Sequence, residues 1–288
     1  MGSAFGASGP ARLLPGGEGT TWQVGDVVLK PAADPQGASW CAELFAGLEG
    51  PGFRVPRPRR TVAGAWLADG WAVWERVEGE PGPVEHWPGL IAASRAFHAA
   101  LADVPHPGWL CGRRDRWAVA DRIAWGEASV VVAPGLQGLV DDLVAARAPV
   151  ELPSQLVHGD LAGNVLFADG QAPAVIDFSP YWRPAGYALA VAAVDVLVWS
   201  AAPPSILDAL DSEERRDQLL LRALLYRLVA ESLGPPDPQS RQAVHDAAEP
   251  VVDLVVADIQ SGLPHNTLLR TKFSARTLNL GTSVIRPL

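Results

Sequence analysis

The 288-residue sequence predicts an α+β protein with a small β-rich N-terminal lobe, residues 1–78, and a larger helical C-terminal lobe, residues 79–288. The first observation is a set of short β-branched and alternating runs that end before residue 78. The second is a change to helical spacing of apolar residues beyond residue 88. The third is the segment GEPGP between them, whose glycines and prolines are typical of a linker.

Turn signals and alternating residues define the elements of the first lobe. Gly25-Asp26 and Asp69-Gly70 each separate two extended runs, and Asp-Gly is a dipeptide typical of β-hairpins. Strands are expected over residues 21–24, 27–30, 62–67 and 71–77, and a helix over 38–48.

Apolar residues at helical spacing define the second lobe. The run after residue 185 is almost wholly apolar, which predicts a buried helix. Asp211, followed three residues later by Glu214, forms a capping-box pattern that predicts a helix start at 212. Pro250 predicts a bend in the last helix, and the tail 262–288 has no clear period. Helices are expected over 88–102, 138–147, 185–200, 212–233 and 239–261, and a strand pair over 165–168 and 174–178.

Composition excludes several classes of protein. Hydrophobic residues make up 48% and charged residues 19%, which is ordinary for a globular protein with a core. The net charge of −9 argues against a nucleic-acid surface and is compatible with a cationic substrate. Only two cysteines are present, so no disulfide framework is expected and a reducing cytoplasm is the natural location. We expect no membrane helix, because the most apolar stretch, 187–199, is too short and contains Asp195.

One segment concentrates the residues that can perform chemistry. LVHGDLAGNVLFADGQAPAVIDF places His158, Asp160, Asn164 and Asp177 around a loop and a hairpin. An Asp and an Asn a few residues apart can face one volume, and a second Asp after a returning strand can meet them from the side. Two oxygen ligands and a free carboxylate suit Mg²⁺ together with proton acceptance from a hydroxyl.

The order HGD, N, IDF resembles the catalytic core of the aminoglycoside phosphotransferase and choline kinase family, within the protein-kinase-like fold. The similarity spans most of the chain. It implies transfer of the γ-phosphoryl group of ATP to a hydroxyl of a small molecule such as an aminoglycoside or amino sugar. By this resemblance Asp160, Asn164 and Asp177 are catalytic. Asp160 is the base or hydroxyl-orienting residue, Asn164 and Asp177 hold Mg²⁺, and His158 braces the loop.

The N-terminal lobe also contains segments that resemble those of this family, in the same order along the chain. A Gly-rich segment between two strands can bind phosphates through backbone N–H groups. The resemblance further implies that Lys30 meets the α- and β-phosphates, that Glu43 pairs with Lys30, and that the backbone of Glu75 and Val77 contacts adenine. The alternative for Glu43 is that it is simply an exposed helix residue. The alternative for Glu75 and Val77 is that they belong to an ordinary edge strand. The Gly-rich segment is PGGEGTT, with Gly16, Gly17, Gly19 and Thr20 as its nucleotide-binding residues.

Two departures from the family pattern are visible. The catalytic Asp and the Asn are separated by three residues here, where four are usual. A loop shortened by one residue moves the Asn by up to roughly 3.3–3.6 Å unless the turn is rebuilt, and Gly163 can permit this because it accepts a positive φ. Ala188 stands where many relatives have a bracing Asp, and Asp195, two turns further on, is a candidate replacement.

The acceptor is not defined by the sequence. SPYWRP (179–184) should line its cleft, with Tyr181 and Trp182 stacking on a ring and Arg183 binding an anion; the alternative is that this loop only packs. Acidic residues after residue 200 would favour a cationic acceptor, but neighbouring arginines offset them. A catalytically silent nucleotide- or partner-binding module is the rival to a working kinase. A protein kinase is disfavoured because HRD, DFG and APE strings are lacking.

Overall fold

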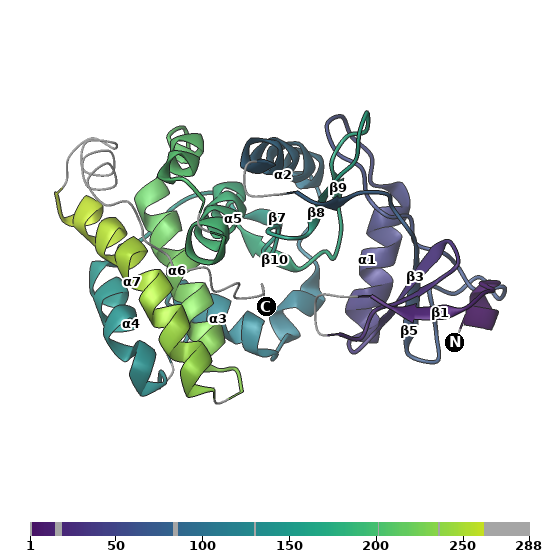
Figure 1. Cartoon of the computed structure of the whole chain (residues 1–288), viewed down its shortest axis with the longest axis horizontal. Helices are drawn as coiled ribbons and strands as arrows, with labels where there is room; N and C mark the ends of the chain where they lie inside the picture. The colour runs from purple at the N-terminus through teal and green to yellow at the C-terminus, as the bar shows by residue number, and fades with distance from the viewer. Residues whose placement is uncertain are drawn as a thin grey trace.

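The computed structural model describes residues 2–14, 19–82, 86–129, 131–200, 202–235 and 237–261. Gly16 and Gly17 of the expected phosphate loop and the tail 262–288 lie outside these residues. Figure 1 shows the strand-rich part and the helical part at opposite ends of the long axis. The predicted α+β arrangement is confirmed.

The N-terminal part is an antiparallel sheet with the strand order β1-β2-β3-β5-β4. In β3 every second residue is buried, so Val27 and Leu29 face a small core that Phe5, Val24 and Val73 complete. The register pairs Lys30 of β3 with Ala72 of β5 and leaves its side chain outside that core. The strands are β1 (Ala11–Leu13), β2 (Trp22–Val24), β3 (Val27–Pro31), β4 (Leu67–Ala68) and β5 (Trp71–Glu75).

Helix α1 (Pro35–Gly47) links this sheet to the rest of the protein. Asp34 caps the helix by accepting a hydrogen bond from the Gln36 backbone N–H at 3.1 Å, which satisfies one otherwise unpaired donor. Further along, the ring of Phe45 lies 5.3 Å from that of Phe178 and 6.2 Å from that of Phe97. These rings join the N-terminal part to the main core, directly beside Asp177.

The C-terminal part is a helical assembly around α5. Residues Gly186 to Val198 of α5 are all buried, as predicted for an apolar helix surrounded by neighbours. Figure 1 shows α6 alongside α5, with α4 and α7 further out. The helices are α2 (Trp87–Leu101), α3 (Arg116–Ala124), α4 (Pro134–Ala146), α5 (Ala185–Trp199), α6 (Arg216–Ser232) and α7 (Pro238–Ser261), with short 3₁₀ helices η1 (Gly2–Phe5), η3 (Gly108–Gly112) and η4 (Pro204–Leu210).

Two small sheets position the HGD segment. β7 (Gln155–His158) pairs antiparallel with β10 (Pro180–Arg183), and β8 (Val165–Phe167) lies between β6 (Glu80–Pro81) and β9 (Ala174–Val175). Because β8 and β9 form the expected hairpin, the residues just before and just after it are brought to the same end.

The structure differs from the sequence-based expectation at several elements. The predicted capping box, and with it a helix start at residue 212, is wrong. Helix α6 begins at Arg216, after Arg215 in a left-handed backbone conformation, and the Asp211 carboxylate accepts a hydrogen bond from Arg216. The strand expected over 62–67 is reduced to β4, and the pattern missed α3, β7 and β10. These elements are short, so packing decides their conformation more than local periodicity does.

Candidate active site

The shortened loop closes as a tight turn. The backbone N–H of Asn164 donates to the carbonyl of Leu161 at 3.0 Å, and Gly163 has a φ of +78°. A positive φ at the third residue is what a type II turn requires, and glycine adopts it without steric cost. The loop is therefore rebuilt around Gly163.

This turn holds Asp160 and Asn164 together. The Asn164 side-chain Nδ2 donates to the Asp160 carbonyl at 2.8 Å and to Asp160 Oδ2 at 3.2 Å. The Ile176 backbone N–H donates to the Asn164 carbonyl at 2.9 Å. Since Ile176 directly precedes Asp177, the three expected catalytic residues gather at one end of the β8–β9 hairpin.

His158 ties the turn to the hairpin from below. Its ring is buried, and Nδ1 accepts from the Asp160 backbone N–H at 3.1 Å while Nε2 donates to the Ile176 carbonyl at 3.0 Å. Burial lowers the pKa of His158, and the pKa of neighbouring His98, whose Nε2 accepts from the His158 backbone N–H, is lowered to about 3. Both rings are thus neutral, which matches the bracing role expected for His158.

The glycine of the HGD string is needed for close packing. A Cβ at Gly159 would lie 2.5 Å from ring atoms of Tyr181, so any larger side chain would displace β10. Glycine here lets the two strands approach and keeps Asp160 at the end of β7.

Asp177 meets the N-terminal sheet through Lys30. The Lys30 Nζ lies 2.8 Å from Asp177 Oδ1, and Asp177 has a φ of +53°. Partial burial opposes ionisation, but the ammonium of Lys30 outweighs it and holds the pKa of Asp177 below its ordinary value. The ring of Phe178 packs 5.5 Å from His158 and anchors the segment.

The expected pairing of Glu43 with Lys30 is wrong in this structure. The Glu43 carboxylate accepts from Trp66 Nε1 at 2.7 Å and from Arg60 at 3.3 Å. The Arg60 guanidinium also stacks on the Trp66 ring, 3.6 Å from its centroid. Glu43 therefore has nearer partners, and Lys30 is paired with Asp177.

The other residues expected at the nucleotide lie in the N-terminal sheet and the segment that follows it. Gly19 and Thr20 are exposed between β1 and β2, and Gly19 has a φ of +69°. The backbone N–H of Glu75 is used, because it donates to the Arg57 carbonyl at 2.7 Å. An adenine contact from Glu75 would have to use its carbonyl group, with Val77 two residues on.

Arg227 is the site residue that sequence reasoning missed. Its Nη2 donates to Asp160 Oδ1 at 2.7 Å, and its Nε donates to Asp195 Oδ1 at 2.6 Å. Asp195 thus braces the loop that carries Asp160 through Arg227 instead of directly. The sequence held one clue to this pair. Asp195 is a single acidic residue in the apolar helix α5, and Arg227 is a complementary charge in the buried helix α6.

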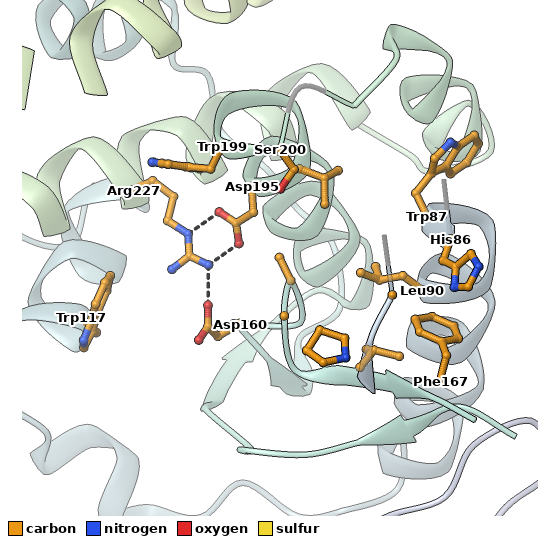
Figure 2. A pocket seen from close by; sticks show the side chains of 16 residues that line it. His86, Trp87, Leu90, Trp117, Asp160, Phe167, Asp195, Trp199, Ser200 and Arg227 are labelled. Atoms are coloured by element: carbon orange, nitrogen blue, oxygen red, sulfur yellow. Dashed lines mark hydrogen bonds and ion pairs between the residues drawn. The ribbon is translucent and has the colours of Figure 1, made fainter. Parts of the chain in front are cut away.

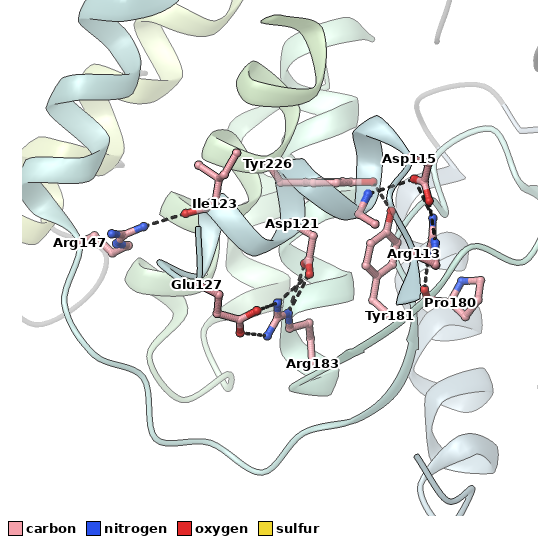
Figure 3. A network of polar contacts seen from close by, with 11 residues as sticks. Arg113, Asp115, Asp121, Ile123, Glu127, Arg147, Pro180, Tyr181, Arg183 and Tyr226 are labelled. Atoms are coloured by element: carbon pink, nitrogen blue, oxygen red, sulfur yellow. Dashed lines mark hydrogen bonds and ion pairs between the residues drawn. The ribbon is translucent and has the colours of Figure 1, made fainter. Parts of the chain in front are cut away.

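The segment after Asp177 packs instead of lining the cleft. Arg183 is held by Asp121 at 2.7 Å and by Glu127 at 2.6 Å, and the Tyr181 hydroxyl lies 2.9 Å from that of Tyr226. Figure 3 shows Arg183 against Asp121 and Glu127, and Tyr181 beside Tyr226. The expected anion-binding role of Arg183 is therefore wrong, and the packing alternative holds.

The donor set fits Mg²⁺. Because Nδ2 of Asn164 points to Asp160, the Oδ1 atom of the same amide is the one left for a cation, and the Asp177 carboxylate is half-exposed nearby. Among the described residues no group of three or more His, Cys, Asp or Glu forms a metal cage. Mg²⁺ commonly takes one or two protein oxygens and completes its shell with phosphate and water.

The sequence profile of the phosphotransferase enzyme family, APH, matches residues 11–181, which include β1, Lys30 and the whole HGD-to-IDF segment. The chain belongs to this family. The resemblance inferred from the sequence is confirmed, and the membership supports a small-molecule phosphotransferase. No curated protein has significant sequence similarity to the chain.

Solved structures show the same kinase-like fold for this family member. A thermostable mutant of aminoglycoside phosphotransferase APH(4)-Ia, in a ternary complex with AMP-PNP and hygromycin B, is 16% identical with a TM-score of 0.58, over 91% of this chain and 98% of that one. A microcompartment-associated aminopropanol kinase is 17% identical with a TM-score of 0.59, over 90% and 95%. A choline/ethanolamine kinase family protein from Mesorhizobium loti is 19% identical with a TM-score of 0.54, over 89% and 94%.

A cavity of about 220 Å³ opens on the Asp160 side of the phosphotransferase. It lies between the start of α2, the β6–β8 pair and the ends of α5 and α6, and Asp160, Asp195 and Arg227 form one wall (Figure 2).

No helix in the described ranges has the length and apolarity needed to cross a membrane.

Proposed function

We propose that the protein is a Mg²⁺-dependent kinase that transfers the γ-phosphoryl group of ATP to a hydroxyl of a small molecule. One observation carries this proposal. Asp160 and Asn164 lie in the same turn and are joined by a hydrogen bond. The Ile176 backbone N–H donates to the Asn164 carbonyl, and the next residue, Asp177, forms an ion pair with Lys30 of the N-terminal sheet. A proton acceptor, two oxygen ligands and a phosphate-binding cation thereby meet at the junction of sheet and helices.

Each residue has a role in the transfer. Lys30 and the backbone around Gly19 and Thr20 would bind the phosphates. Asn164 Oδ1 and the Asp177 carboxylate would hold Mg²⁺, which would neutralise phosphate charge when bound. This division assigns the nucleotide to residues 1–78 and the acceptor to residues 79–288.

Asp160 would orient the acceptor hydroxyl and take its proton. The acceptor oxygen forms a bond to the γ-phosphorus, and the bond from that phosphorus to the β–γ bridging oxygen breaks, which leaves ADP. Arg227 donates to Oδ1 at 2.7 Å and Asn164 donates to Oδ2 at the longer distance of 3.2 Å, so the proton goes to the remaining lone pair of Asp160 Oδ2. Positioning and charge neutralisation supply most of the rate in such transfers.

Thermal melting with and without Mg·ATP tests the nucleotide site. Binding to the folded state stabilises it by about 2.7 kcal/mol at a ligand concentration 100 times Kd. We expect a Mg²⁺-dependent rise in Tm for the wild type and its loss in Asp177→Ala. The exposed turn variant Asp169→Ala serves as the control, with an unchanged rise. No shift at millimolar Mg·ATP would favour the catalytically silent module instead.

A further inference from the structure

We propose that the helical part binds a small inorganic anion, such as chloride or phosphate, at a site built from residues other than those assigned to phosphoryl transfer. Trp125 at the end of α3, Tyr187 in the first turn of α5 and Arg222 of α6 form the site, and Arg147 lies beside them. The inference follows from buried polar atoms without partners and from the charge around them, and it does not depend on the proposed function.

Three buried polar atoms meet here without hydrogen-bond partners. Trp125 Nε1, the Tyr187 hydroxyl and Arg222 Nε are closed off from solvent, and none has a partner within the described ranges. The rings of Trp125 and Tyr187 are 5.3 Å apart, and the Arg222 guanidinium carbon lies 4.9 Å from the Trp125 centroid. Two of these atoms can only donate, and the third is a hydroxyl. Buried donors in a native protein are normally satisfied, so this group indicates a bound acceptor such as water or an anion.

The charge of Arg222 favours an anion over water. Arg222 is only 3% exposed, and its other nitrogens donate to neutral oxygens, at 2.9 Å to Gln218 Oε1 and at 2.7 Å to the Ala148 carbonyl. No ion pair joins it to a carboxylate in the part of the chain that the structure describes. Burial, followed by the neighbouring Arg147 guanidinium, lowers the pKa of Arg222 to about 10, so the group stays charged at neutral pH. A buried charge is costly unless an opposite charge accompanies it.

The groups around Arg222 leave an excess of positive charge. Arg183 lies against the Trp125 ring, 4.8 Å from its centroid, and is held by two carboxylates. Arg215 pairs with Asp217 at 3.8 Å. Four guanidinium groups therefore face three carboxylates among the groups that contact Trp125, hold Arg183 or act on Arg222. These groups are Arg147, Arg183, Arg215 and Arg222, with Asp121, Glu127 and Asp217.

Arg147 connects the buried donors to the protein surface. Its Nη1 donates to the Ile123 carbonyl at 2.8 Å, as Figure 3 shows, and its guanidinium crosses the backbone at Gly126. A Cβ at Gly126 would lie 3.1 Å from the guanidinium carbon, so glycine permits this approach. Arg147 is partly exposed, which gives a small anion a route from solvent. The tight packing of Trp125 on Tyr187 favours an inorganic ion over an organic acid.

Thermal melting at constant ionic strength tests the site. Sodium chloride or sodium phosphate replaces sodium gluconate, whose larger organic anion serves as the reference. An anion that binds only the folded protein raises its stability, and we expect a saturable rise in Tm of about 2–4 °C in the wild type. A rise with either inorganic anion supports the proposal, and comparison of the two identifies the preferred ion.

Two variants place the effect at the site. Arg147→Gln removes a partly exposed charge, and we expect the anion concentration at half-saturation to rise at least about tenfold. Arg222→Met removes the buried donor and should abolish the rise; Arg147→Gln keeps the test available if this variant does not fold. The exposed Arg114→Gln changes the net charge equally and serves as the control, with an unchanged rise.

A further variant separates this site from the proposed nucleotide site, because phosphate could also meet Lys30. We expect the rise in Tm to persist in Lys30→Met. A rise that is lost in Lys30→Met and kept in Arg147→Gln overturns the proposal. Equal rises in the wild type, Arg147→Gln and Arg222→Met would be a general salt effect and also overturn it. No rise with either anion would show that water alone satisfies the buried donors.

Discussion

Arg227 donates to Asp160 at 2.7 Å although the two residues are 67 positions apart in the chain. The same guanidinium is held from behind by Asp195 of α5. Asp195 and Arg227 are mostly buried, with 9% and 10% of their side chains exposed, and Asp160 is 32% exposed. One oxygen of Asp160 is therefore fixed by a charged hydrogen bond, and the direction of the other oxygen follows from it.

We expect Arg227→Met to lower kcat by about 100-fold, because a misplacement of about 1 Å at a reacting group has an effect of that size. KM for ATP should stay unchanged, since the nucleotide residues lie elsewhere. Loss of Arg227 also leaves Asp195 buried without its partner, which destabilises a protein by about 3–5 kcal/mol.

The double variant Arg227→Met with Asp195→Leu separates positioning from stability. Removing both charges should recover much of the lost stability, measured by chemical unfolding, while kcat stays low. A double variant that recovers both stability and kcat would show that Arg227 acts only on the fold.

Asp160→Asn tests the proton acceptor. An amide keeps the size and the oxygen that Arg227 contacts, but it cannot take a proton from the acceptor. We expect turnover to fall by about 10²–10⁴-fold, with the Mg·ATP-induced rise in Tm preserved. The exposed turn variant Asp169→Asn is the control. Undiminished turnover in Asp160→Asn would falsify the base assignment.

Gly163→Ala tests the rebuilt turn. A Cβ at this position meets nothing within 4 Å, so its effect comes from the backbone φ of +78° alone. We expect the free energy of unfolding to fall by about 1–2 kcal/mol, because alanine is strained at this φ. We also expect activity to depend less strongly on Mg²⁺, because the proposed ligand Asn164 shifts with the turn. Gly138→Ala in α4, which also has an open Cβ, is the matched control and should stabilise the protein by about 0.5–1 kcal/mol. Equal effects of both substitutions would contradict the turn geometry.

The buried histidines predict a loss of stability in acid. The pKa of His98 is about 3 in the folded protein, against about 6.5 when unfolded, so below pH 6.5 the unfolded chain binds protons that the folded chain does not. The free energy of unfolding is therefore highest above pH 6.5 and falls as the pH decreases toward 3. His98→Gln should reduce this slope by about 1.4 kcal/mol per pH unit. The exposed His106→Gln should leave the slope unchanged, and identical slopes in wild type and His98→Gln would refute the prediction.

Much of the fold and the centre of the site were predictable from local pattern. The apolar run of α5 predicted a buried helix, and the strands around Asp169-Gly170 predicted the β8–β9 hairpin. Asn164 and Asp177 flank that hairpin, so their proximity follows from sequence spacing alone. The possibility that Gly163 rebuilds the short loop also followed from its tolerance of positive φ.

The errors at the site concern side-chain partners supplied by distant parts of the chain. Glu43 was expected at Lys30, but the loop carrying Arg60 and Trp66 supplies its partners instead. Arg183 was expected to bind an anion, but α3 supplies Asp121 against it. Local sequence does not reveal which loop or helix packs against a given charge.

The sequence by itself determined the order of the expected catalytic residues, the hairpin that brings Asn164 and Asp177 together, and membership of the phosphotransferase family. These features depend on short-range spacing and backbone preference. Only the tertiary structure decided that Asp195 acts on Asp160 through Arg227. That arrangement depends on how α5 packs against α6, because buried charges select the partner that the packing places beside them.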